Sequence, residues 1–299
     1  MDFDKQMKIA VYGRPFNDSA VIPFIQEVFD VLIQHNVGIY VHQQLHDYLN
    51  GKLKAVKYEI LKDHDYLRES IDVLLTLGGD GTLLDMVTMI RDSGTPVIGI
   101  NFGRLGFLAS VNKNDIAAAI YAVVNKQFTL DSRELLQIDC EEKIFGIDNF
   151  ALNDITVHKR DDAAMITIHG SLNNEFLNSY WGDGIIVSTS TGSTAYSLSC
   201  GGPILFPQSN SIVVTPISPH NLNVRPIVLP DSSTLTFDVE CRSANYLVSC
   251  DSRTAIVEKT MKFHICKAGF QLNLIRLNNE SYLSTLRTKL LWGLDARNY

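Results

Sequence analysis

The chain has 299 residues, a length that allows about two domains. It is 45% hydrophobic and 20% charged, a balance that can bury a sizeable core, and its formal net charge is -7. An acidic chain lacks the basic field that long nucleic acids need, so we expect no nucleic-acid partner. A small anionic substrate stays possible, because backbone amides and a few local cations can bind phosphate.

The cysteines and the hydropathy pattern bear on the compartment. Five cysteines are widely spaced and form no Cys-x-x-Cys pair, which favours free buried thiols in a reducing environment. Residues 1–8 contain no apolar signal core, and no apolar run approaches the roughly 18 residues needed to span a bilayer. We therefore expect a cytoplasmic protein with no membrane partner.

The first 125 residues alternate between short apolar runs and stretches with helical periodicity. Strands are predicted over residues 8–12, 38–41, 71–77 and 95–100. Helices are predicted after a cap at Ser19, near residue 43, over 82–93 and over 115–124. The apolar face of the first helix comprises Val21, Phe24, Ile25, Val28, Leu32 and Ile33. This alternation predicts an α/β domain with a parallel sheet over residues 1–125.

The pattern changes near residue 126, after which short β-rich stretches are separated by turn residues. Strands are predicted over 154–157, 164–169, 184–188, 211–216, 234–239, 246–249 and 262–265. No long helical period appears before residue 281, and a short terminal helix is predicted over 282–291. Residues 126–275 are therefore predicted to form an all-β, sandwich-like domain, followed by a tail over residues 276–299.

A glycine-rich turn follows the apolar run at 71–77. Gly78-Gly79-Asp80-Gly81-Thr82 places several backbone N–H groups at the start of the next helix, where they favour an anion. The missing Cβ atoms let phosphate oxygens approach the backbone. A carboxylate such as Asp80 repels phosphate unless it performs chemistry or meets a metal; the plain alternative is a tight turn in which Asp80 caps the helix. The turn is neither a Walker A loop nor a Rossmann fingerprint.

Two further clusters lie in the β-rich half. Asn153-Asp154 pairs a neutral hydrogen-bonding group with an acid, which suits the vicinal hydroxyls of a ribose, although Asn-Asp is also a common turn. Residues 183–203 begin with Asp183, include a strand, and continue as a dense run of hydroxyl-bearing and small residues around Tyr196. Such a run lets a ligand lie close to the backbone while hydroxyls bind ribose and phosphate. The alternative is a Ser/Thr-rich loop without a ligand.

The histidines offer no clear chemistry. His220, in Ser-Pro-His, is either a base or a structural residue. No Cys/His pattern has metal-ligand spacing, so no protein metal site is expected. His42, His46 and His64 fall in a polar segment and are expected to be solvated.

Together these stretches resemble the NAD kinase family over most of the chain. The resemblance is carried by residues 78–82, 99–108, 151–154, 183–203 and 286–293. The first motif is shared with diacylglycerol-type lipid kinases, whereas the stretch 183–203 is much more particular to NAD kinases.

The resemblance implies an N-terminal α/β domain, a C-terminal β domain that binds the dinucleotide, a tail that returns to the first domain, and a homo-oligomer, dimer or tetramer. It implies transfer of the γ-phosphoryl group of ATP, with Mg²⁺ or another divalent cation, to the 2′-hydroxyl of the adenosine ribose of NAD. Asp80 would take the proton, Gly81 would supply backbone contact, and Asn153 and Asp154 would hold ribose hydroxyls. The dinucleotide pocket would include Asp183, Thr194, Ala195, Tyr196, Ser197, Leu198 and Ser199.

The sequence departs from the family pattern at several positions. Asp154 stands where many members have Glu, and Ser190 replaces a usual Pro. Ala164 stands where some members carry a basic side chain. Asp251-Ser252-Arg253 replaces a commoner Asp-Gly-Gln, so Arg253 is a candidate contact for phosphate or ribose. These differences leave the preference between NAD and NADH open.

Two other functions remain as alternatives at this stage. A lipid kinase would share the glycine-rich turn, but it would need a membrane-facing surface, and the sequence shows no basic amphipathic helix. A nucleotide sensor would bind NAD without turnover, and the presence of Asp80 argues against it.

Overall fold

The computed structural model describes residues 6–54, 56–103, 106–160, 165–241, 245–258, 261–277 and 281–292. The chain divides into two compact units, residues 1–132 with 272–299, and residues 133–271. Within the described residues, no helix is both long and apolar enough to cross a membrane.

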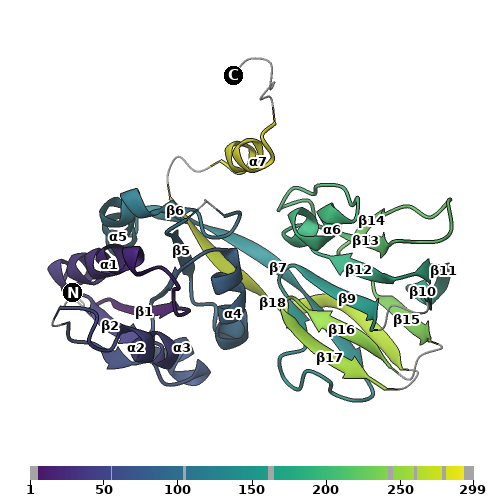
Figure 1. Ribbon diagram of the computed structural model, residues 1–299, viewed down its shortest axis with the longest axis horizontal. Coiled ribbons are helices and arrows are strands. Elements are labelled where there is room, and N and C mark those ends of the chain that lie inside the picture. Colours follow the sequence, from purple (N-terminus) through teal and green to yellow (C-terminus); the bar gives the residue numbers. More distant parts are fainter. Residues whose placement is uncertain are drawn as a thin grey trace. The chain divides into compact units, whose positions relative to one another are not determined.

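The first unit is an α/β domain with a parallel sheet (Figure 1). Its strands are β1 (Lys8–Gly13), β2 (Gly38–Val41), β3 (Glu59–Ile60), β4 (Val73–Leu77), β5 (Val97–Asn101) and β6 (Val111–Asn112). They are ordered β3-β2-β1-β4-β5, and both β6 and the end of β18 (Lys262–Leu277) pair with β5 in parallel. β1 and β4 are buried almost throughout, as expected for strands covered on both faces.

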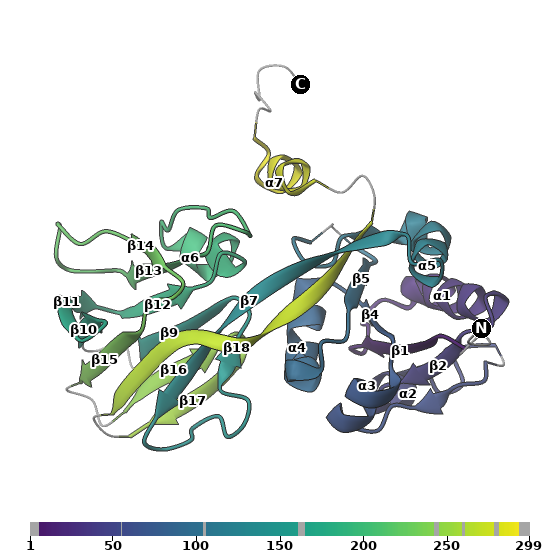
Figure 2. The same ribbon diagram turned by 180° about the vertical axis from the view of Figure 1, so that it is seen from behind.

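Helices cover both faces of this sheet. They are α1 (Ile22–Gln34), α2 (Gln43–Leu49), α3 (His64–Ser70), α4 (Asp80–Ile90) and α5 (Ile116–Val124), with 3₁₀ turns η1 (Ser19–Val21), η2 (Arg91–Ser93) and η3 (Lys113–Asp115). Seen from both sides, α1 and α5 lie on one side of the sheet, and α2 and α3 lie on the other (Figures 1 and 2).

The sequence predicts most of these elements, with local errors. The predicted cap at Ser19 is wrong: the carboxylate of Asp18 accepts the N–H of Ala20 and caps the turn η1, and α1 begins after Val21 without a side-chain cap. Its predicted apolar face is wrong at one edge: Ile33 is 47% exposed, whereas Phe29 and Val31 are buried. The helix after the glycine turn begins at Asp80, two residues before the predicted start.

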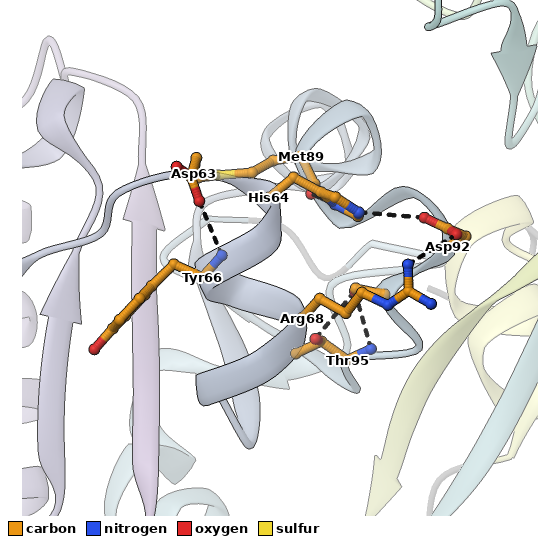
Figure 3. A network of polar contacts seen from close by, with 8 residues as sticks. Asp63, His64, Tyr66, Arg68, Met89, Asp92 and Thr95 are labelled. Carbon is orange, nitrogen blue, oxygen red and sulfur yellow. Dashed lines mark hydrogen bonds and ion pairs between the residues drawn. The ribbon is translucent and has the colours of Figure 1, made fainter.

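Helix α3, which the sequence did not predict, is held by polar contacts to the end of α4 and to η2 (Figure 3). Asp63 caps α3 by accepting the N–H of Tyr66. The ring of His64 contacts the carbonyl of Met89 at 2.9 Å through Nδ1 and the carboxylate of Asp92 at 3.2 Å through Nε2. The expectation that His64 is solvated is therefore wrong, because its side chain fixes this helix against its neighbour.

The second unit contains two antiparallel sheets. One contains β11 (Glu175–Gly182), β10 (Ile166–Leu172), β15 (Leu235–Glu240) and the start of β18, and β7 (Phe128–Cys140) pairs with β18 and with β8 (Phe150–Ala151). The other has the order β14 (Ile227–Pro230), β13 (Ser211–Ile217), β12 (Gly184–Ser188), β9 (Asp154–Lys159), β16 (Tyr246–Cys250) and β17 (Arg253–Val257). Side chains from both sheets form one apolar core, including Val157, Ile168, Val187 and Phe237. The expected sandwich-like class is confirmed.

The remaining elements of the second unit and the tail are short. The turn η4 (Gly192–Thr194) and the four-residue helix α6 (Tyr196–Ser199) follow β12, and α7 (Tyr282–Leu290) lies in the tail. The sequence does not predict strands β7, β8, β11, β14 and β17, and β18 runs to residue 277, not 265. The positions Ala164, Arg104, Leu105 and Gly293, which carry parts of the predicted strand and of the family motifs, lie outside the described residues.

Candidate functional site

The first part of the candidate site lies in the first unit, where β4 meets α4. Gly78 has φ +141°, and a Cβ there would lie 2.3 Å from Oγ1 of Thr82, so both the conformation and the space require glycine. Gly79 is the N-cap residue of α4 and provides no side-chain cap. This 11-residue helix therefore starts without a side-chain cap on its N–H groups, as an anion site needs.

Asp80 is the first residue of α4, and its carboxylate is held by backbone N–H groups of a distant loop. Oδ2 accepts the N–H of Phe107 at 2.8 Å, and Oδ1 accepts those of Leu108 at 3.0 Å and Ala109 at 2.9 Å. A carboxylate offers about four acceptor positions. Among the described residues one position, on Oδ2, is therefore left for another donor.

A cation that the sequence analysis missed lies beside the same turn. Arg14 follows the last residue of β1, and β1 and β4 are neighbouring parallel strands whose ends, Gly13 and Leu77, are paired. Nε and Nη2 of Arg14 both donate to the carboxylate of Asp85 on α4. Nη1 lies 3.9 Å from the position of a Cβ on Gly81, so this edge of the guanidinium borders the phosphate turn.

Asp85 is also contacted by Tyr12, whose hydroxyl donates to Oδ2 at 3.2 Å. Burial and the adjacent carboxylate raise the pKa of Tyr12 to about 12, so the phenol stays a proton donor at neutral pH. The sequence shows that Arg14 directly follows a buried strand. It does not show that this strand neighbours β4, so Arg14 could not be identified from the sequence.

The second part of the candidate site lies in the second unit and starts with Asn153 and Asp154. Asn153 is half-buried, and Asp154 is the first residue of β9. The carboxylate of Asp251, in the turn before β17, accepts the N–H groups of Leu152 at 2.9 Å, Asn153 at 2.8 Å and Asp154 at 3.3 Å. Asp251 thus fixes the backbone of the predicted ribose-binding pair, a role that the sequence analysis did not assign.

The carboxyl group of Asp154 is almost enclosed, with the residue 7% exposed. Burial, followed by the neighbouring charge of Asp251, raises the pKa of Asp154 to about 7. Burial also raises the pKa of Asp251, against the opposing effect of its three backbone hydrogen bonds. A proton on Asp154 is therefore exchanged near neutral pH, so the group can accept or donate a hydrogen bond there.

The hydroxyl-rich loop after β12 is anchored on Asn153. The N–H of Thr189 donates to the carbonyl of Asn153 at 2.9 Å, and its hydroxyl donates to the carbonyl of Leu152 at 2.6 Å. A Cβ on Gly192 would lie 2.1 Å from the oxygen of Asn153, so the two segments meet backbone to backbone. The loop and the Asn-Asp pair are therefore one structural group.

Most of the loop hydroxyls are used inside the protein. Ser190 donates to the carbonyl of Pro207, Ser193 to that of Ser190, and Thr194 to that of Thr191. Ser197 is fully buried, and its hydroxyl bonds that of Thr215 at 2.8 Å. These hydroxyls thus bond to other groups of the protein, which differs from the expectation that they bind ribose and phosphate.

The exposed part of the loop is formed by other predicted residues. Tyr196 is 42% exposed and Ser199 is exposed, while Thr194, Ala195 and Leu198 are half-buried. The pKa of Tyr196 is raised by burial, then by Cys200, and also by the charges of Asp154 and Asp183. Tyr196, Asp154 and Asp183 are thus close enough to interact, so the second unit brings these predicted residues together.

Asp183 lies in the turn between β11 and β12. Its carboxylate pairs with Nζ of Lys159 at 2.8 Å, and its backbone carbonyl accepts the N–H of Lys159. A Cβ on Gly184 would lie 2.3 Å from the carbonyl oxygen of Val157, so this turn is packed tightly on β9.

Arg253 occupies a structural position. Its guanidinium donates to the carbonyls of Asp148 and Phe150 and lies 5.4 Å from the ring centre of Phe150. His220 lies against the ring of Trp181, with centroids 4.3 Å apart. Within the described part of the chain, no three His, Cys, Asp or Glu side chains are grouped as metal ligands.

Two family profiles cover most of the chain. The ATP-NAD kinase N-terminal domain matches residues 10–128, and the ATP-NAD kinase C-terminal domain matches residues 152–277. The chain is 47% identical to the NAD kinase of Flavobacterium psychrophilum over 295 residues, which is 98% of this chain and 100% of that protein. It is 43% identical to the NAD kinase of Cytophaga hutchinsonii over the same length and coverage.

Solved structures with the same fold include two at 23% identity. The crystal structure of yeast NADH kinase complexed with NADH has a TM-score of 0.87 and covers 98% of this chain and 90% of that one. The structure of an NAD kinase from Archaeoglobus fulgidus in complex with ATP has a TM-score of 0.73 and covers 95% and 99%.

Proposed function

The chain belongs to the NAD kinase family, and on that premise we propose that it transfers the γ-phosphoryl group of ATP to the 2′-hydroxyl of the adenosine ribose of NAD, giving NADP and ADP. The observation that carries the proposal is the position of Asp80. Its carboxylate, which keeps one open acceptor position among the described residues, stands on the first residue of a helix whose N-terminus suits phosphate.

Phosphoryl transfer proceeds through a loose transition state, so catalysis consists mainly of positioning and charge neutralisation. Asp80 accepts the proton of the ribose hydroxyl as the new O–P bond forms, a step typically worth about 10²–10⁴ in rate. The N–H groups at the start of α4, with the backbone of Gly81, bind the triphosphate. Arg14, which borders Gly81, places a fixed positive charge beside it.

The second unit holds the dinucleotide in this proposal. Asn153 and Asp154 bind ribose hydroxyls, and Tyr196 offers its exposed ring as a stacking surface. Asp183, Thr194, Ala195, Leu198 and Ser199 line the pocket, with Ser197 beneath them. Arg253 supports the backbone before Asn153; the proposal that it also touches phosphate would require it to leave two carbonyl acceptors.

Mg²⁺, or another divalent cation, enters with ATP as part of the substrate. Both carboxylates at the phosphate turn already have partners in the protein. Asp80 is held by three N–H groups, and Asp85 is paired with Arg14. Mg²⁺ usually keeps several waters and takes phosphate oxygens with one or two carboxylates. Its contribution is to neutralise the charge on the transferred group.

We further propose a homo-oligomer, dimer or tetramer, and a cytoplasmic location. The location is supported by five cysteines without a disulfide among them. Light scattering coupled to size-exclusion chromatography tests the assembly, and a mass equal to that of one chain would contradict it.

The experiment that tests the function is an assay of NADP formation by the purified protein. ATP and polyphosphate are supplied in turn as phosphoryl donors, and NAD and NADH as acceptors. We expect NADP with ATP and NAD. Binding of NAD without product in every combination would rule out the kinase activity, whereas phosphorylation of diacylglycerol would assign the chain to lipid kinases.

A further inference from the structure

A turn at residues 106–109 surrounds the side chain of Asp80. Three consecutive N–H groups, those of Phe107, Leu108 and Ala109, point at one carboxylate from a segment 27 to 29 residues away in sequence. The turn is closed by a hydrogen bond of 3.1 Å from the N–H of Gly106 to the carbonyl of Ala109. Its donors are therefore arranged around the carboxylate before any substrate arrives.

The space around the carboxylate admits only glycine at position 106. A Cβ there would lie 1.8 Å from Oδ1 of Asp80 and 2.6 Å from its Cγ. The residue is buried, and the lack of space for a Cβ requires glycine there. The atoms that would be displaced belong to a side chain, so the least costly response to a Cβ is movement of the Asp80 carboxylate.

The turn is itself fixed to the sheet. Ala109 lies against Gly99 of β5, where a Cβ on the glycine would meet the Cα of Ala109 at 2.7 Å. Val111, two residues further on in β6, pairs with Ile100 of β5. The carbonyl of Phe107 accepts a hydrogen bond from Nη2 of Arg276 at 3.3 Å, and Arg276 also pairs with Asp131. The turn is thus tied to β5 through Ala109, to β6 through Val111 and to Arg276 through Phe107.

We infer that the turn Gly106–Ala109 is the positioning device of the catalytic base: it holds Asp80 in one orientation and, among the residues that the structure describes, leaves one acceptor direction, on Oδ2, for the ribose hydroxyl. Gly106 is a positioning residue, since it acts only through Asp80. The inference rests on the proposed kinase function. It goes beyond that function by assigning the orientation of the base to a loop outside the glycine-rich turn.

The test is the substitution Gly106→Ala in the full-length protein, measured by the kinetics of NADP formation. Displacement of a reacting group by about 1 Å can cost on the order of 10² in rate. We expect kcat to fall about 10²-fold while KM for ATP and KM for NAD change less than about threefold. The matched control is Gly103→Ala, because a Cβ at that exposed position would lie at an ordinary 3.6 Å from Oδ1 of Asn101.

A double-mutant cycle separates positioning from a general loss of structure. In an Asp80→Ala background there is no carboxylate to displace, so adding Gly106→Ala should change neither the residual rate nor the melting temperature. Wild-type kcat in Gly106→Ala, or an equal further loss in the double variant, would overturn the inference.

The same cycle also tests the inference if the single variant Gly106→Ala does not fold. If Gly106→Ala alone unfolds, recovery of the fold in the double variant supports the contact with Asp80, and no recovery overturns it. Absence of NADP formation by the wild type would contradict the proposed function instead. The melting temperatures of the single and double variants would then still test the contact between Gly106 and Asp80.

Discussion

At the scale of single residues, the two acids of the candidate site have different surroundings. Asp80 receives three backbone N–H donors, which hold its carboxylate in a fixed orientation. Asp154 is buried beside the carboxylate of Asp251, and both burial and that charge favour its neutral form. The same residue type is therefore suited to accepting a proton at one position and to holding a hydroxyl at the other.

The raised pKa of Asp154 predicts how stability depends on pH. The folded pKa is about 7 and the ordinary value is 3.8, so the folded state holds an extra proton between these values, and stability falls as pH rises through that window. The full effect is on the order of 4 kcal/mol, at 1.36 kcal/mol per unit. Asp154→Asn has no carboxyl group to titrate at this position, so it lacks this loss of stability. The free energy of unfolding of Asp154→Asn minus that of the wild type should therefore be larger at pH 8 than at pH 5. Urea unfolding of both proteins measures it; an unchanged difference would contradict the shift.

Arg14 provides a second prediction at this scale. Arg14→Gln removes the charge beside Gly81, and a charge-assisted hydrogen bond is worth about 1.5–3 kcal/mol. We expect KM for ATP to rise roughly 10-fold or more while KM for NAD stays within about twofold. Arg14→Lys keeps the charge but not the two-pronged contact with Asp85, so it should recover only part of the loss. Equal effects on both substrates would remove Arg14 from the phosphate site.

At the scale of elements, the sequence predicts those strands, turns and helices whose signals lie within one short segment. The strand, glycine turn and helix at residues 73–90 follow from a buried apolar run, three glycines and a helical period, all within one short stretch. The hydrogen bonds of Asp80 to the turn Gly106–Ala109 join residues 27 to 29 positions apart, and the contact of Asp251 with Asn153 joins residues 98 positions apart. Contacts of that separation leave no local signal, so the sequence could not predict them.

Strands with mixed burial were missed for a related reason. β7 contains charged residues among apolar ones, and its burial does not alternate strictly, so no period of two stands out. The sequence shows where the hydroxyl-bearing residues after β12 lie, but it does not show which groups they bind. Sequence composition shows that Ser190, Ser193 and Ser197 carry donors; it does not show that these donors bind other parts of the same chain.

The contact between the loop and Asn153 gives a prediction for this element. Gly192→Ala would place a Cβ 2.1 Å from a backbone oxygen, which cannot move as a side chain would, so the loop must shift away from the ribose-binding pair. We expect KM for NAD to rise on the order of 10-fold with little change in KM for ATP. Gly269→Ala on β18, where nothing lies within 4 Å of the added Cβ, is the control. A normal KM for NAD in Gly192→Ala would separate the loop from dinucleotide binding.

At the scale of the whole molecule, each unit carries one half of the proposed chemistry. The α/β unit has the phosphate turn with Asp80, and the β unit has the Asn-Asp pair with its loop. The fold class of both halves could be predicted from the sequence, because alternation of strand and helix and a succession of short strands are properties of long segments. The division falls after residues 132 and 271, whereas the predicted boundaries are at 125 and 275.

This division predicts where each substrate protects the backbone. In hydrogen exchange, ATP with Mg²⁺ should slow exchange chiefly at residues 78–82, and NAD should slow it chiefly at 152–154 and 189–200, because a ligand lowers the population of locally open states where it binds. Protection of the phosphate turn by NAD alone, with none in the loop, would contradict the assignment of substrates to units.

The most direct test of the central claim is the turnover of Asp80→Asn with saturating ATP and NAD. Loss of the proton acceptor predicts a fall in kcat of about 10²–10⁴, with the dissociation constant of NAD largely unchanged. The same variant should melt as a folded protein, since only one of the two carboxylate oxygens is replaced. A variant that folds, binds NAD and forms NADP at near the wild-type rate would show that Asp80 is not the base.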